Sequence, residues 1–138
     1  MTLKPDQGVE IPVLSTGRVH KNIDFTIMLW FKIDEDYQEH VSESDFMYLF
    51  SFEDSAACFL TQNALMCDSW DRKKLQIISD ELIPGKWFHL TLSCATDDRQ
   101  SFLLLQDNTH QIAIAEATNF GFRQNTKYGW KACLGDCL

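Results

Sequence analysis

Acidic side chains at turns are the first residues of this sequence that could do chemistry. Residues 96–100 and 107–109 are predicted to form turns. Hard cations such as Ca²⁺ bind several oxygen ligands from Asp, Asn and backbone carbonyls. If both turns lie at one end of the fold, the candidate calcium ligands are Asp97, Asp98, Asp107 and Asn108. Asp and Asn also belong in turns for local hydrogen bonding, which explains the same residues without a metal.

Paired carboxylates would support glycoside hydrolysis. A retaining pair holds its carboxyl groups roughly 5 Å apart, and alternate positions on one strand supply that spacing. The acidic clusters are Asp34, Glu35, Asp36 and Glu39, then Glu53 and Asp54. The first cluster follows a strand-like segment instead of lying on it, so solvated loop charges are the favoured interpretation. We expect no catalytic residue.

Five cysteines are present, and the spacing of two of them predicts a disulfide. Residues 58–67 resemble a hairpin. A two-residue turn at residues 62–63 places Cys58 opposite Cys67 at a non-hydrogen-bonded position, where Cβ atoms lie roughly 4.5 Å apart. A turn one residue later would put Cys58 opposite Ser69 and exclude the bond. The residues leave both registers open.

The other cysteines do not form an evident reactive site. His89 and Cys94 are five residues apart on one predicted strand, so their side chains point to opposite faces. In an extended strand Cys133 and Cys137 lie about 13 Å apart, and only a bend at residues 135–136 would bring them together. A zinc site needs four ligands, and no convincing second pair exists.

Aromatic side chains near turns are candidates for stacking against a ligand. They fall in predicted loops or at strand ends: Trp70, Phe122, Tyr128 and Trp130. The alternative role is packing across a sandwich edge, since Trp is highly buried on average. Trp30 and Trp87 fall within predicted strands, and we expect them to be structural.

Composition and charge narrow the class of protein. The chain has 138 residues, of which 45% are hydrophobic and 12% aromatic, enough for a single domain with a real core after a tail at residues 1–7. A net charge of -8 argues against nucleic acid and anionic membranes as partners. No run reaches the roughly 18 apolar residues of a membrane span. The odd cysteine count and the absence of an apolar leader favour the cytoplasm for the chain as given, or an extracellular place within a larger exported protein.

Apolar residues recur with period two along most of the chain. Predicted strands cover residues 24–33, 46–53, 75–79, 87–95, 102–106, 111–115 and 130–134, besides the hairpin. Short strands separated by turn signals about every eight to twelve residues predict an all-β antiparallel sandwich. No strands alternate with long amphipathic helices, which argues against a doubly wound fold.

Several of these strands resemble the laminin G-like and pentraxin-like branch of the concanavalin A-like lectin/glucanase superfamily. Residues 24–33, DFTIMLWFKI, are similar to its early F-T-I-x-x-W-x-K strand. Residues 83–93, IPGKWFHLTLS, resemble its G-x-W-x-H-v-a-v strand, and YLFSF at 48–52 sits where it often reads L-F-S. Residues 102–114 fit its next hairpin, with Asn108 or Thr109 in place of the turn glycine. The resemblance covers roughly residues 8–138.

This resemblance implies a jelly-roll sandwich and a non-catalytic module that recognises protein or carbohydrate. In the family a final strand or two normally follows the strand that residues 131–136 resemble. We therefore expect missing last strands and an open C-terminal sheet edge that a partner pairs with. The alternatives are an intracellular scaffold or assembly subunit whose edge a partner completes, and a degenerate glycan hydrolase, although neither acidic cluster matches the family's E-x-D-x-x-E array. Calcium is the one cofactor considered.

Overall fold

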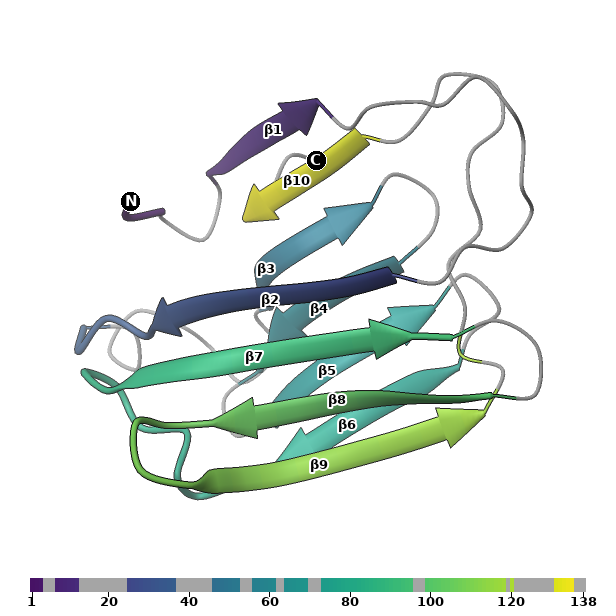
Figure 1. The fold of residues 1–138 in the computed structure, drawn as a ribbon. Helices are drawn as coiled ribbons and strands as arrows, with labels where there is room; N and C mark the ends of the chain where they lie inside the picture. The colour runs from purple at the N-terminus through teal and green to yellow at the C-terminus, as the bar shows by residue number, and fades with distance from the viewer. Residues whose placement is uncertain are drawn as a thin grey trace.

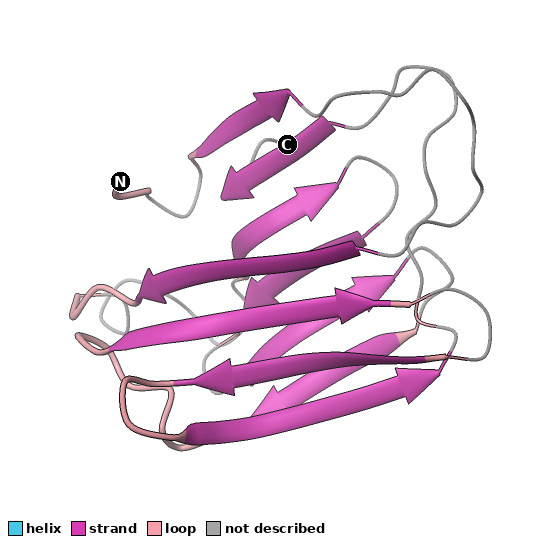
Figure 2. Cartoon of the chain, viewed as in Figure 1, coloured by secondary structure: helices cyan, strands magenta, loops and turns pink. Residues whose placement is uncertain are grey.

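The computed structural model of the chain describes residues 1–3, 7–12, 25–36, 46–52, 56–61, 64–69, 73–95, 99–118, 120 and 131–135. Within these ranges the backbone forms strands and turns and no helix (Figure 2). The same residues therefore include no helix that could cross a membrane. The strands are β1 Gly8–Pro12, β2 Phe25–Lys32, β3 Met47–Phe52, β4 Ala56–Leu60, β5 Ala64–Ser69, β6 Lys74–Ile78, β7 Trp87–Cys94, β8 Gln100–Gln106, β9 Gln111–Thr118 and β10 Lys131–Gly135.

Two antiparallel sheets pack face to face (Figure 1). The larger sheet has six strands in the order β1-β10-β3-β4-β5-β6, and the smaller has four in the order β2-β7-β8-β9. This β-sandwich confirms the predicted all-β antiparallel fold class. The hairpin predicted over residues 58–67 is also confirmed, as β4 and β5.

The core lies between the sheets and is built mainly by alternation along the strands. On β7, Phe88, Leu90 and Leu92 point inward and are completely buried. β2 pairs with β7 so that Leu29 lies opposite Leu90 and Phe31 opposite Phe88. Directly opposed residues share one face of a sheet, so both strands present the same apolar face to the core. Their alternate residues point to the outer face of the sheet.

The C-terminal strand is internal, and the prediction of an open edge there is wrong. β10 lies between β1 and β3, with Val9 opposite Leu134 on one side and Phe50 opposite Leu134 on the other. Among the described strands, β1 is the edge strand on this side of the larger sheet. The sequence pattern did not predict β1. Its five residues carry only Val9 and Ile11 as an alternating apolar pair and end in Pro12, too little signal for a strand.

Two glycines occupy left-handed backbone positions that shape the strand connections. Gly85 has φ of 83° and donates its N–H to the Ile33 carbonyl at 2.8 Å, which docks the entry to β7 against the end of β2. Gly135 has φ of 78° at the end of β10, where a Cβ would collide with the Gln7 carbonyl and the Leu3 side chain. Residues with a Cβ rarely adopt this conformation, so both positions require glycine.

Replacing Leu90 by Ala tests the assignment of strand faces. Leu90 is completely buried, so Leu90→Ala should lower the free energy of unfolding by about 2–5 kcal/mol in urea denaturation. Ile78→Ala is the control, because Ile78 is 71% exposed; it should cost about 0.5 kcal/mol or less. A Leu90→Ala loss no larger than the control's would mean that the faces are reversed.

Candidate functional site

The outer face of the four-stranded sheet carries two exposed tryptophans. Trp30 on β2 is 52% exposed and Trp87 on β7 is 51% exposed. Together with Asn108 they line a shallow, open depression of about 360 Å³. In the β2–β7 register Trp30 lies opposite His89 and Trp87 opposite Lys32, so the two indoles are diagonal neighbours.

Each indole has a neighbour that fixes it. The Trp30 ring meets the His89 ring edge-on, with centroids 4.9 Å apart and planes at 62°. The Lys32 Nζ lies 5.4 Å from the centroid of the Trp87 ring, in cation–π range. The tryptophans are thus held as a pair of surface aromatics and are not core residues.

We expected these two tryptophans to be structural; both lie half-exposed on the outer face, and alternation explains why. Each has a phenylalanine beside it, Phe31 after Trp30 and Phe88 after Trp87, and both phenylalanines are buried. Adjacent strand residues point to opposite faces, so a buried Phe forces its Trp neighbour outward. The repeated Trp-Phe pair is the signal that would have located the site.

The third pocket residue, Asn108, sits on the turn between β8 and β9, which Asp107 braces. Asp107 Oδ1 accepts hydrogen bonds from the backbone N–H groups of Thr109 at 2.8 Å and His110 at 2.9 Å, and from the Thr109 hydroxyl at 2.9 Å. Asp107 Oδ2 lies 2.8 Å from the Lys86 Nζ, and the Asp107 side chain is only 4% exposed. This network holds the turn and presents Asn108 beside Trp87.

The Asp107 carboxylate is stabilised in its charged form. The hydrogen bond from Lys86 lowers the pKa of Asp107 well below its ordinary range, and the backbone N–H groups of Thr109 and His110 lower it further. Asp107 is therefore ionised at neutral pH and acts on the pocket only by positioning the turn.

The same turn tests part of the calcium hypothesis. Asp107 and Asn108 lie together as expected, whereas Asp97 and Asp98 lie outside the described residues. Glu81 and His110 join Asp107 in a group whose candidate ligand atoms lie within 4.8 Å of one another. The His110 Nε2 lies 3.3 Å from Glu81 Oε2, and the His110 Nδ1 lies 3.3 Å from Asp107 Oδ1. Both carboxylate oxygens of Asp107 already accept hydrogen bonds. A cation there would compete with the turn's own hydrogen bonds, and calcium binding stays a prediction.

The remaining candidates for ligand binding or catalysis are placed only in part. Trp70, Phe122, Tyr128 and Trp130 lie outside the described residues, as do Glu39, Glu53 and Asp54. Asp34 accepts a hydrogen bond from the Asp36 backbone N–H at 3.2 Å, which is turn chemistry. Asp34, Glu35 and Asp36 follow β2 and are exposed, as predicted for solvated loop charges.

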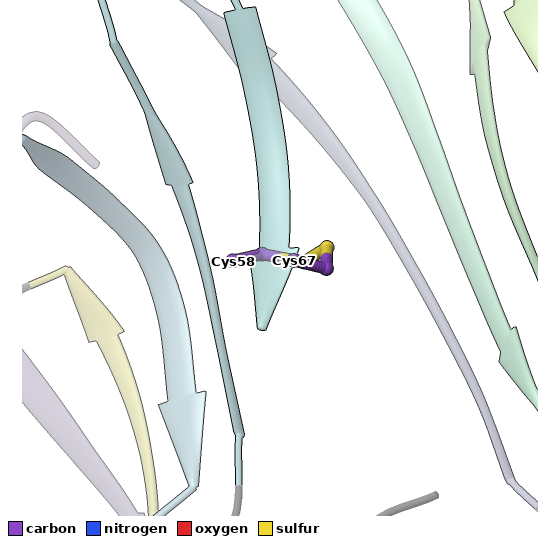
Figure 3. The surroundings of a disulfide bond; sticks show 2 residues. All are labelled: Cys58 and Cys67. Atoms are coloured by element: carbon purple, nitrogen blue, oxygen red, sulfur yellow. A yellow bond between two sulfur atoms is a disulfide. The ribbon is translucent and has the colours of Figure 1, made fainter. Parts of the chain in front are cut away.

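A disulfide joins Cys58 to Cys67 across the β4–β5 hairpin (Figure 3). The Thr61 N–H donates to the Ala64 carbonyl at 2.9 Å, which fixes the register that a turn at residues 62–63 predicts. The Cα atoms of the two cysteines lie 4.2 Å apart, as expected at a non-hydrogen-bonded pair. Both cysteines are buried, so the bond forms part of the core.

The other described cysteines differ from this pair. Cys94 carries a free thiol in the core, and burial raises its pKa far above the ordinary value. Its side chain is buried while that of His89 stands beside Trp30 on the outer face, as the five-residue spacing predicts. Cys133 is also disulfide-bonded.

Comparison with known proteins adds no relatives. No family model matches the chain, and no curated protein or solved structure matches it significantly. The resemblance to the concanavalin A-like superfamily therefore stays a prediction drawn from the sequence motifs.

Alkylation of the native protein tests the cysteine assignments. Because Cys94 is buried and protonated, iodoacetamide should leave it unmodified in buffer and modify it fully in urea.

Non-reducing digestion should yield a linked pair of peptides that contain Cys58 and Cys67. Replacing both with Ala should cost about 2–3 kcal/mol of stability for a loop this short. Native labelling of Cys58 or Cys67 would contradict the assignment.

Acid titration tests the role of Asp107. The pKa of Asp107 is lower in the folded state than in the unfolded state, where it is about 4. The ionised carboxylate therefore contributes fully to the free energy of unfolding above that pH, and the contribution is lost as the pH falls through the folded-state pKa. Asp107→Asn should therefore be less stable than the wild type at pH 7 and lose less stability on acidification. Urea denaturation across pH measures this, with the exposed Asp80→Asn as control. Equal acid sensitivity in wild type and Asp107→Asn would contradict it.

Proposed function

We propose that this chain is a non-catalytic recognition module that binds carbohydrate on the outer face of its four-stranded sheet. The observation that supports the proposal is the open surface pocket lined by Trp30, Trp87 and Asn108. Exposed large apolar side chains gathered on one surface mark interaction sites more often than random surface does. Trp30 and Trp87 come from adjacent strands of a rigid sheet, so the spacing of the indoles is set before a ligand arrives.

The chemistry of the pocket suits a sugar ring. A pyranose presents apolar C–H groups on its faces and hydroxyls around its rim, and an indole offers a broad, flat apolar surface with an electron-rich face. The Asn108 side chain supplies both donors and an acceptor for hydroxyl groups. His89 and Gln106 are paired across β7 and β8 beside Trp30 and add polar groups to the same face.

The arrangement favours binding over hydrolysis. A retaining glycosidase needs two carboxyl groups roughly 5 Å apart facing the scissile bond. Asp107, the nearest acidic residue in sequence to Asn108, directs its carboxylate to Lys86 and the turn backbone instead of to the pocket. Among the described residues the pocket is lined by two indoles and an amide, and none of these three side chains carries a carboxyl group.

The disulfide supports an exported setting for such a module. Disulfides persist in oxidising compartments and are rare in the cytosol. The buried Cys58–Cys67 bond therefore favours the extracellular alternative over the cytoplasmic one that the cysteine count suggested. Extracellular glycans are the carbohydrate that such a protein would meet.

Glycan-array binding with tryptophan variants tests the proposal. Trp30→Ala and Trp87→Ala should each weaken binding at least tenfold, about 1.4 kcal/mol, because each removes one stacking surface. Phe46→Ala is the control, since Phe46 is an exposed aromatic that precedes β3 in the other sheet and packs on Phe59. Chelation of calcium should leave binding intact. An array without binders, or equal binding by all variants, would overturn the proposal.

A further inference from the structure

The edge strands of the two sheets differ in how they are protected against pairing. Natural edges are blunted by proline, charges, bulges, short length or cover. β1 ends in Pro12, the five-residue β6 begins with exposed Lys74, and β9 carries exposed Glu116 and an irregular register with β8. β2 contains no proline and pairs with β7 without a shift over all eight residues; like β6 it has one lysine at an end, Lys32, and no described strand pairs with its other side.

Next to the β2 edge, the inner face of the larger sheet is incompletely covered. Phe50 faces the core and is buried. Leu134 pairs with Phe50 and Val9 pairs with Leu134, so all three share the inner face. Even so, Val9 is 42% exposed. Burial on this face therefore falls from β3 through β10 to β1.

The mismatch in sheet width explains this exposure. The larger sheet has six strands and the smaller has four. The sandwich is closed on the side where β6 contacts β8 and β9, so the surplus strands project on the β2 side. Figure 1 shows β10 and β1 standing beyond β2. A strand added to β2 would lie above β10 and β1 at about the 10 Å separation of packed sheets.

We propose that β2 accepts an extended segment of a partner protein, which adds to the four-stranded sheet as a fifth strand and covers the inner face of β10 and β1. The added segment runs antiparallel to β2, like every described strand pair in both sheets. It spans up to eight residues, alternates apolar side chains toward Val9 and Leu134 with polar ones outward, and places an acidic residue opposite Lys32. Backbone hydrogen bonds supply affinity and the covered apolar face supplies register.

The geometry argues against a second copy of the chain as the occupant. Two copies joined through their β2 strands would lie about 4.8 Å apart at the join. Each copy's larger sheet projects beyond its own β2, by the width of the two surplus strands. Both projections would need the same space, so a single segment fits where a whole domain does not.

Amide hydrogen exchange with a designed peptide tests the proposal. The probe is acetyl-Glu-Val-Thr-Val-Thr-Val-Thr-Val-Lys-Lys-amide, which places Glu opposite Lys32 and valines on the inner face. At saturation it should slow exchange at least tenfold at alternate β2 residues, those whose N–H groups face away from β7. A control peptide with proline at the two central valines should have no effect, because proline removes the ladder donors.

A charge on the covered face separates this site from the carbohydrate site. Val9→Glu should weaken peptide binding at least tenfold, because the added strand would bury the carboxylate, and should leave glycan binding unchanged. Ile78→Glu, at the exposed β6 edge of the same sheet, is the matched control and should bind the peptide normally. Trp87→Ala changes β7 and not the acceptor strand, so it should weaken glycan binding and retain peptide binding.

Three results would overturn the proposal. The first is full protection of all β2 amides in the free protein, which would mean that another segment of the chain already fills the edge. The second is a dimer in sedimentation that Val9→Glu dissociates, which would make a second copy the occupant. The third is unchanged β2 exchange with the probe at concentrations up to its solubility limit.

Discussion

The pairing of β2 with β7 is the interaction on which the rest of the structure depends. Eight consecutive opposed pairs align two strands that have the same alternation, so Leu29, Phe31, Phe88 and Leu90 enter the core together. The same alignment places the residues between them on the outer face of the sheet. A one-residue slip would send the phenylalanines to solvent and the tryptophans inward. Core stability and the exposed tryptophan pair are therefore two consequences of a single register, and selection on either one constrains the other.

The turns at one end of the sheet place Asn108 beside the two tryptophans and so complete the pocket. Gly85 ties the start of β7 to the end of β2 through its hydrogen bond to Ile33, and the next residue, Lys86, reaches Asp107. Asp107 in turn organises the β8–β9 turn that carries Asn108. Three strands that are neighbours in the sheet thus share one chain of polar contacts. A polar group is placed beside the indoles by residues that do not themselves line the pocket.

Sequence reasoning recovered the features that local patterns encode and missed those that need tertiary context. Alternation located most strands and gave the all-β antiparallel sandwich, and the hairpin spacing gave the register that joins Cys58 to Cys67. It did not reveal β1, because five residues ending in proline carry little pattern, and so it placed the open edge at β10. It treated Trp30 as structural because Trp30 falls within a predicted strand, without using the outward facing that alternation gives it. For the open edge the decisive fact was that β1 lies alongside β10.

The distribution of burial determines how the open edge affects the fold. Except for Phe120, the largest completely buried side chains come from β4 to β8, where the sheets overlap, and the Cys58–Cys67 bond lies in the same region. The β1–β10 end contributes much less to the core, as the exposure of Val9 indicates. A strand that adds to β2 would therefore enlarge a core that is already complete elsewhere, without rearranging it. Because the acceptor is formed beforehand, the added segment alone loses conformational entropy on binding, and this cost favours segments that are already extended in solution.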